Sequence, residues 1–229
     1  MTVSGIARSF SLDYGESHLN VSCDLDLRSA ALDELIRQYT LLVAYINKNP
    51  LFKSSYEPVE VEEDALGVVK DMAEAAFRCG VGPMAAVAGA LAQRVGERLL
   101  SEGAADVIVD NGGDIYVKAA GVKTVGLNAG KSPFSGEIAF RVKPEETPCG
   151  ICTSAGTVGH SISLGEADAV TVVADSTALA DAAATSIGNE VRGGVEGGLG
   201  KAKTIAGIRG VLIVKGGLMG AWGGLPQII

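Results

Sequence analysis

The chain has 229 residues, of which 47% are hydrophobic, and a net charge of -8 at pH 7. This length and apolar content are sufficient for a sizeable core, so we expect one domain over residues 1–229. The acidic balance argues against a nucleic-acid groove or an anionic membrane surface, because neither polyanion gains counterion release from an acidic face. A phosphorylated ligand would need local help from backbone amides at a helix start or from a metal ion.

The N-terminus and the cysteines bear on the cellular compartment. Met1-Thr-Val-Ser has no basic region that leads into an apolar segment, so we predict no signal peptide and expect a cytoplasmic protein. No stretch reaches the length of a transmembrane helix without glycine or charge. Cys149 and Cys152 form a Cys-Gly-Ile-Cys motif, which is weak evidence for redox or metal chemistry; the simpler interpretation is two small buried residues.

The N-terminal part predicts a hairpin followed by helices. Residues 6–12 and 18–25 alternate loosely around a Tyr-Gly turn, and residues 29–47 have apolar positions at helical spacing. The acidic segment 50–63 is expected to be a solvated connection. Two more helices are predicted at 64–77 and 83–101.

The start of the helix at 83–101 is a candidate anion site. Pro83 suits the first helical turn, and Gly82 before it exposes backbone amides at the positive end of the helix dipole. A Gly-x-Gly segment before a helix also commonly just caps and links two helices. The pattern alone leaves both interpretations of Gly82 open.

Further strands are predicted around the turn Asn111-Gly112-Gly113. Segments 104–110 and 114–118 flank this turn, whose glycines permit positive φ and favour a tight hairpin. Asp114 would favour ribose or amide contacts if it is buried. Segments 122–127 and 136–142 are expected to extend the same antiparallel sheet.

The C-terminal part contains the strongest local signal. Residues 151–159 mix hydroxyl residues with glycines and are interpreted as a binding loop, and residues 169–174 read as a buried strand. In the helix that follows, capped by Ser176 or the aspartate before it, Asp181 and Thr185 share one face. Oxygen ligands at this spacing suit magnesium, although a local hydrogen bond is the commoner explanation. A glycine-rich turn at 189–200 and a hairpin of strands 208–214 and 218–222 complete the chain.

Three motifs resemble the ApbE-like flavin transferases, in the same order. The segment from Asp168 to Ala174, together with Ala178-Leu-Ala-Asp181-Ala-Ala-Ala-Thr185, is similar to that family's C-terminal magnesium-binding signature. The segment Val109-Asp-Asn-Gly-Gly-Asp-Ile is similar to its Asn-x-Gly-Gly-Asp-Ile motif. Gly80-Val-Gly-Pro-Met-Ala is similar to the segment that opens a helix near the flavin dinucleotide.

A closer resemblance is to the shorter, uncharacterised UPF0280 group, through residues 81–89, 111–114 and 152–161. Together these resemblances imply an ApbE-like, T-fold-like α+β fold with antiparallel sheets, packed helices and two related halves. We place the halves at 1–63 with 190–229, and at 64–189. The ligand cleft is expected where the glycine-containing motifs converge.

The resemblance also implies magnesium and flavin adenine dinucleotide (FAD) as ligands. By position, Asp181, Thr185 and the carbonyl of Ala85 would hold the metal, and His160 or Asp181 would assist attack of a protein threonine hydroxyl on the FAD pyrophosphate. His160 could instead merely tie its loop to a carbonyl. The residues expected to bind the cofactor are Gly82, Asn111, Gly112, Gly113, Asp114, Thr153, Ser154 and Gly156.

Departures from the flavin transferases keep a second hypothesis open. Ala86 stands where that family has a lysine, and Ser161-Ile-Ser-Leu-Gly replaces an Asp-Pro-Arg-Thr-Gly run. The first hypothesis is an enzyme that binds a flavin or another nucleotide with magnesium, with flavin transfer as its reaction. The alternative is a non-catalytic ligand-binding or sensor protein that retains the cleft. The expected partner is a small phosphorylated or nucleotide ligand; whether the chain forms a homodimer is left open.

Overall fold

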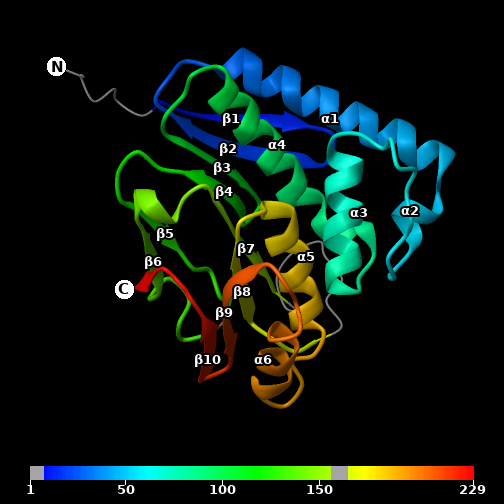
Figure 1. Ribbon diagram of the computed structural model, residues 1–229. Coiled ribbons are helices and arrows are strands. Elements are labelled where there is room, and N and C mark those ends of the chain that lie inside the picture. Colours follow the sequence, from blue (N-terminus) through cyan, green and yellow to red (C-terminus); the bar gives the residue numbers. More distant parts are fainter. Residues whose placement is uncertain (1–7, 131, 156–164) are drawn as a thin grey trace.

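The computed structural model describes residues 8–130, 132–155 and 165–229. Within them the chain forms three layers: helices, a large antiparallel sheet, and a small sheet on the side opposite the helices (Figure 1). One set of apolar side chains fills the space between the helices and the large sheet, and a second set lies between the two sheets. The expected α+β architecture with antiparallel sheets and packed helices is confirmed.

The large sheet has eight strands in the order β1-β2-β3-β4-β7-β8-β9-β10, and every neighbouring pair is antiparallel. The predicted N-terminal, central and C-terminal hairpins are all present in it, joined by short turns. The strands are β1 (Arg8–Tyr14), β2 (Ser17–Cys23), β3 (Val107–Asn111), β4 (Asp114–Lys118), β7 (Cys149–Ser154), β8 (Ala169–Ala174), β9 (Ile208–Lys215) and β10 (Leu218–Gly223).

The helices cover one face of this sheet (Figure 1). They are α1 (Arg28–Lys48), α2 (Leu51–Ser54), α3 (Val68–Cys79), α4 (Val87–Ser101), α5 (Thr177–Gly188) and α6 (Glu196–Ala202), with short 3₁₀ turns η1 (Pro83–Ala86) and η2 (Pro144–Glu146). No single helix in the described residues is long and apolar enough to cross a membrane, although α3 and the segment Pro83–Ser101 pass that test as a pair bent by 106°.

One predicted helix and one predicted turn differ from the structure. The helix expected at 64–77 begins only at Val68, because Gly67 has a φ of 61° and the side chain of Gln38 accepts the first free amide, that of Val68, at 2.9 Å. The segment 189–200, expected to be a glycine-rich turn, contains the start of α6. Gly198 in that helix packs against Ile213, so tertiary contact overrides the low helix propensity of glycine.

The prediction that segments 122–127 and 136–142 extend the main sheet is wrong. They form strands β5 (Lys123–Gly126) and β6 (Ala139–Val142), which pair with each other and, through β6, with β11 (Gln227–Ile228) in a separate sheet. Apolar residues of these strands, including Phe140, are buried against the face of the large sheet that the helices leave open. Burial of both faces of the large sheet therefore decides the position of this hairpin.

The strand order bears on the proposed halves. Strands β1 to β4 enclose α1, α3 and α4 in the chain, and strands β7 to β10 enclose α5 and α6, so a strand-pair, helix, strand-pair arrangement occurs twice. The hairpins β1–β2 and β9–β10 lie at opposite edges of the sheet, although the predicted halves group them together. The domain boundaries stay a prediction, and the strand order favours a division near residues 119–148.

Helix α5 is held by close contacts between backbones. A Cβ on Gly89 of α4 would lie 2.5 Å from the carbonyl oxygen of Thr177, and a Cβ on Gly150 of β7 would lie 2.4 Å from the Cα of the same residue. Contacts this short are possible only for glycine. The first turn of α5 is therefore fixed between α4 and the sheet.

We expect Gly89→Ala to destabilise the protein by about 2 kcal/mol or more, because the added methyl group must displace backbone atoms of α5. Intrinsic helix propensity alone predicts the opposite sign, a gain of about 1 kcal/mol. Urea unfolding measures the difference. Gly121→Ala is the control, since a Cβ there meets nothing within 4 Å. Equal stabilities of both variants would contradict the close packing of α5.

Candidate functional site

Asp181 and Thr185 are the two positions of α5 that are not buried. Alanines and other small residues fill the rest of the helix and pack it against α3, α4 and the sheet. Ser176 caps the helix, as predicted, by accepting the amide of Leu179 at 3.3 Å. The predicted metal ligands therefore lie together on the one accessible line of an otherwise buried helix.

The start of α4 meets this line and binds the Asp181 side chain. The amide of Gly89 donates a hydrogen bond to Oδ2 of Asp181 at 2.9 Å. The side-chain amide of Asn111, at the end of β3, donates to the carbonyl of Ala88 at 3.2 Å. Segments far apart in the sequence are thus connected through consecutive residues of α4.

Asp114 lies on the same side of the sheet as this contact. It pairs with Asn111 across the β3–β4 hairpin and with Cys152 on β7, whose side chain faces the helices. Paired residues of antiparallel strands point to the same face, so Asn111, Asp114 and Cys152 form a row beneath α4 and α5. The thiol of Cys152 donates to the carbonyl of Thr177 at 3.4 Å, which ties this row to α5.

The carboxyl groups of Asp181 and Asp114 both have raised pKa values. Burial raises the pKa of Asp181 to about 7, against the lowering effect of hydrogen bonds from the amides of Gly89 and Ala88. Burial and the neighbouring charge of Asp181 raise the pKa of Asp114 well above its ordinary value. Both residues keep part of their surface accessible although protein atoms surround them closely.

This donor set fits a hard divalent cation. Two carboxyl groups and one hydroxyl offer oxygen ligands, and a cation would offset the burial that raises the pKa of both Asp181 and Asp114 and the charge of Asp181 that further raises the pKa of Asp114. No group of three or more His, Cys, Asp or Glu residues lies close together in the described ranges. A cation would therefore depend on Asp181, Thr185, Asp114, backbone carbonyls, water and the ligand itself, a pattern typical of magnesium sites.

Ala85 and Gly82, which were also expected to belong to the site, lie just before α4 and differ in how well their positions fit that role. Ala85 lies in η1, which packs against α5, so it is on the correct side of the molecule for the expected carbonyl ligand. Gly82 is buried, and a Cβ there would lie 1.8 Å from the carbonyl oxygen of Ser55. That contact explains the glycine by packing, and its role in ligand binding stays a prediction.

The expected binding loop at 151–159 begins as a strand. Thr153 and Ser154 both belong to β7 and point to opposite faces of the sheet. Ser154 faces the helices, and its hydroxyl is buried without a hydrogen-bond partner in the described part of the chain. Gly156 and the predicted catalytic His160 lie outside the described residues, so their roles stay predictions.

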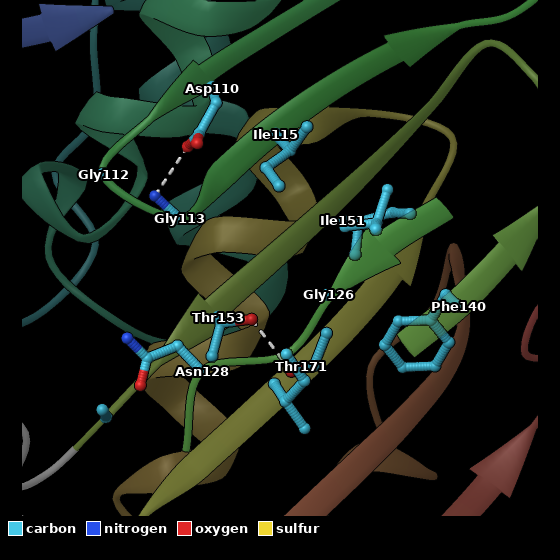
Figure 2. Close-up of a pocket in the computed structure, with 13 residues that line it drawn as sticks. Asp110, Gly112, Gly113, Ile115, Gly126, Asn128, Phe140, Ile151, Thr153 and Thr171 are labelled. Atoms are coloured by element: carbon cyan, nitrogen blue, oxygen red, sulfur yellow. Dashed lines mark hydrogen bonds between the residues drawn. The ribbon is translucent and has the colours of Figure 1, made fainter. Parts of the chain in front are cut away.

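A pocket of about 310 Å³ opens on the face of the large sheet away from the helices (Figure 2). Gly112 and Gly113 of the predicted turn form part of its wall, together with Thr153. Its other polar residues, Asp110, Asn128 and Thr171, were not identified from the sequence. Of these three, Thr171 could have been identified from the sequence, because it is a hydroxyl residue within an otherwise apolar strand.

The redox hypothesis for the Cys-Gly-Ile-Cys motif is not supported by the structure. Cys149 and Cys152 are three residues apart on one strand, so their side chains point to opposite faces of the sheet. Cys152 lies in the core beneath the helices, and Cys149 lies in the core between the two sheets. Burial raises the pKa of Cys149 to about 11 and that of Cys152 well above its ordinary value. Neither thiol is ionised enough to react near neutral pH.

We therefore expect all four thiols to survive mild oxidation of the folded protein, because each one is buried. Thiol titration in denaturant after exposure to oxidised glutathione measures this. Loss of two thiols, prevented by Cys149→Ser, would restore the redox hypothesis.

The raised pKa of Asp181 predicts a pH dependence of stability. A carboxyl group that prefers its protonated form when folded opposes folding once it ionises, so its contribution to the free energy of unfolding falls as pH rises from about 4 to about 7. Asp181→Asn should stabilise the metal-free protein at pH 8 by about 1–2 kcal/mol, allowing for partial exposure, and by much less at pH 4. Urea unfolding in EDTA measures both, with Asp33→Asn as an exposed control; an asparagine variant that is less stable at pH 8 would contradict the burial effect.

Comparison with known proteins identifies the family and the fold. The family model described as AbpE bacteria matches residues 2–203. A UPF0280 protein of Methanococcus maripaludis is 47% identical over 205 residues, which cover 87% of this chain and 83% of the relative. Another, from Methanosarcina acetivorans, is 41% identical over 217 residues, which cover 93% and 85%.

Solved structures show the same fold at low sequence identity. The apo flavinyl transferase ApbE of Pseudomonas stutzeri superimposes with a TM-score of 0.60 at 15% identity and covers 95% of this chain and 94% of its own. The ApbE protein of Thermotoga maritima gives 0.59 at 15% identity, with coverage of 93% and 96%. The chain therefore belongs to the AbpE bacteria family, among the UPF0280 proteins, and has the ApbE fold.

Proposed function

We propose that this protein binds a flavin nucleotide, FAD in the first place, through magnesium held by Asp181 and Thr185. One observation supports the proposal. These two residues are the accessible positions of a buried helix, and a second carboxyl group, that of Asp114, lies close enough to Asp181 for the charge of Asp181 to raise its pKa. In an acidic chain, such a site attracts a cation, and the cation in turn can bind phosphate oxygens. The names of the ApbE structures support flavin as the ligand.

Transfer of the flavin mononucleotide half to a protein hydroxyl is the reaction we propose. The hydroxyl oxygen would form a bond to the phosphorus of that half, the bond between this phosphorus and the bridging oxygen would break, and AMP would leave. The hydroxyl proton would pass to His160 or to Asp181. Magnesium, when bound, would supply charge neutralisation on the phosphates.

Within this scheme the described residues have separate tasks. The amide of Gly89 orients Asp181 by holding one of its oxygens, and Asn111 positions α4 through the carbonyl of Ala88. Ser154, on the helix side of the sheet, has a buried hydroxyl with no hydrogen-bond partner among the described residues. These contacts prearrange the site before any ligand binds.

Binding without transfer is the second candidate function. Ala86, which stands where the resembling transferases have a lysine, is fully buried in the core, so no cationic side chain reaches the site from that position. Absence of AMP release from bound FAD, under conditions in which magnesium-dependent binding is measured, would favour this candidate.

We expect calorimetry to detect FAD binding to the native protein that depends on magnesium and weakens about ten-fold or more in Asp181→Ala. Thr185→Val, which keeps the side-chain shape and removes one oxygen ligand, should weaken it less. Asp33→Ala is the matched control, because that carboxylate is exposed on α1. FAD binding that is independent of magnesium and of Asp181 would overturn the proposed site.

A further inference from the structure

Strand β10 forms one edge of the large sheet, at the end opposite the N-terminal hairpin (Figure 1). Among the described residues its one neighbouring strand is β9, to which the two-residue turn Gly216–Gly217 joins it. Hydrogen bonds in such a hairpin alternate along the strand, so every second residue, beginning with Leu218, bonds toward β9. The backbone amide and carbonyl groups of Met219 and Ala221 therefore point away from the sheet.

This edge lacks the features by which sheets usually prevent association. Edge strands are commonly protected by charged side chains, by proline or by a covering element. Residues 216–225 contain no charged side chain and no proline, and Leu218 and Met219 are 53% and 49% exposed. The strand at the other edge, β1, carries Arg8 and Asp13. Of the two edges, β10 is the one that is open to another strand.

The charge of the protein favours contact at this neutral edge. Each copy of the chain has a net charge of -8, so two copies repel each other where acidic surfaces meet. Like charges directly opposite each other on neighbouring strands are also destabilising, and two antiparallel copies of β10 have none to place opposite. Two copies of this acidic chain can therefore approach at β10 with little repulsion.

Two copies of β10 also complement each other in side-chain size. In an antiparallel pair with its two-fold axis at Ala221, this residue lies opposite itself, and residues at equal distances before and after it lie opposite each other. Each large side chain then lies opposite a glycine of the other copy. The pairs are Leu218 with Gly224, Met219 with Gly223, and Trp222 with Gly220. Large side chains of one copy can thus cover the bare backbone of the other without crowding.

These pairs would bury apolar surface on both faces of the sheet. Gly220 faces α6, since a Cβ there would lie 2.8 Å from Cγ2 of Val195. Trp222 is partly buried on the same side, so in the pair its ring would extend over Gly220 toward α6 of the second copy. Met219 faces the other side of the sheet. Removing this apolar surface from water favours association.

We propose that β10 binds β10 of a second copy of this chain in antiparallel orientation, with the two-fold axis at Ala221, so that one sheet continues across a homodimer. The two Ala221 residues exchange two backbone hydrogen bonds at the axis. This interface is independent of the proposed ligand and reaction.

The first test measures association by sedimentation over a series of protein concentrations. Native protein is expected to show a monomer–dimer equilibrium, and Ala221→Lys to weaken dimerisation about ten-fold or more, because two like charges would face each other at the axis. Ser9→Lys adds the same charge at an exposed position of the opposite edge strand and should leave dimerisation unchanged. Native protein that stays monomeric up to about 100 μM, or a dimer that Ala221→Lys leaves intact, overturns the proposal.

Single cysteine variants test the register without a change of charge. In the proposed pair the Cα atoms of the two Ala221 residues lie about 5.5 Å apart, within the range that a disulfide spans. Met219, which is also exposed, would lie about 13 Å or more from its own copy.

Ala221→Cys is therefore expected to form a disulfide-linked dimer about ten-fold or more faster than Met219→Cys during oxidation with diamide. The native protein is the control and should form none, because its four cysteines are buried. Equal rates of cross-linking in the two variants overturn the proposed pairing.

Discussion

The hydrogen bond from the amide of Gly89 to the carboxylate of Asp181 is the contact on which the site depends. It exists because α4 and α5 approach until the backbone of Thr177 touches Gly89, a distance that a side chain would prevent. The same approach brings Asn111 to the carbonyl of Ala88. A rigid, close-packed junction of two helices thus holds this carboxylate in place.

This junction explains how an acidic protein can prepare a site for an acidic ligand. Burial makes ionisation of Asp181 and of Asp114 costly, and the charge of Asp181 adds to this cost at Asp114. Backbone amides offset only part of the cost at Asp181. A divalent cation is the group that removes this cost, and a phosphate then meets positive charge where the chain alone would repel it. In the proposed function, the cost of ionising these two carboxyl groups is the physical basis for selecting a cation.

The two faces of the large sheet carry different groups. Its helix side holds the carboxyl groups, the amide of Asn111 and the hydroxyl of Ser154, and its other side holds the pocket of Figure 2, which Thr153 and Thr171 line. The Gly112–Gly113 turn lies at the end of the sheet where these faces meet.

By itself, the sequence determined the hairpins, the buried strand β8, and a helix with Asp181 and Thr185 on one face. Each follows from short-range periodicity, turn glycines or capping by Ser176. The family and its fold also followed from the order of the motifs. These features could be predicted because neighbouring residues decide them.

Only the tertiary structure decided which surfaces those elements share. Alternation along β7 predicts that Thr153 and Ser154 point to opposite faces, but it does not say which of them faces the helices and which faces the pocket on the other side. The separate sheet of β5 and β6, and the placing of Cys149 and Cys152 in different cores, likewise depend on partners distant in the chain. The physical reason is that long-range packing decides which residues are buried. A local sequence pattern predicts which residues share a face of a strand or helix, but only the packed layers determine which other element covers that face.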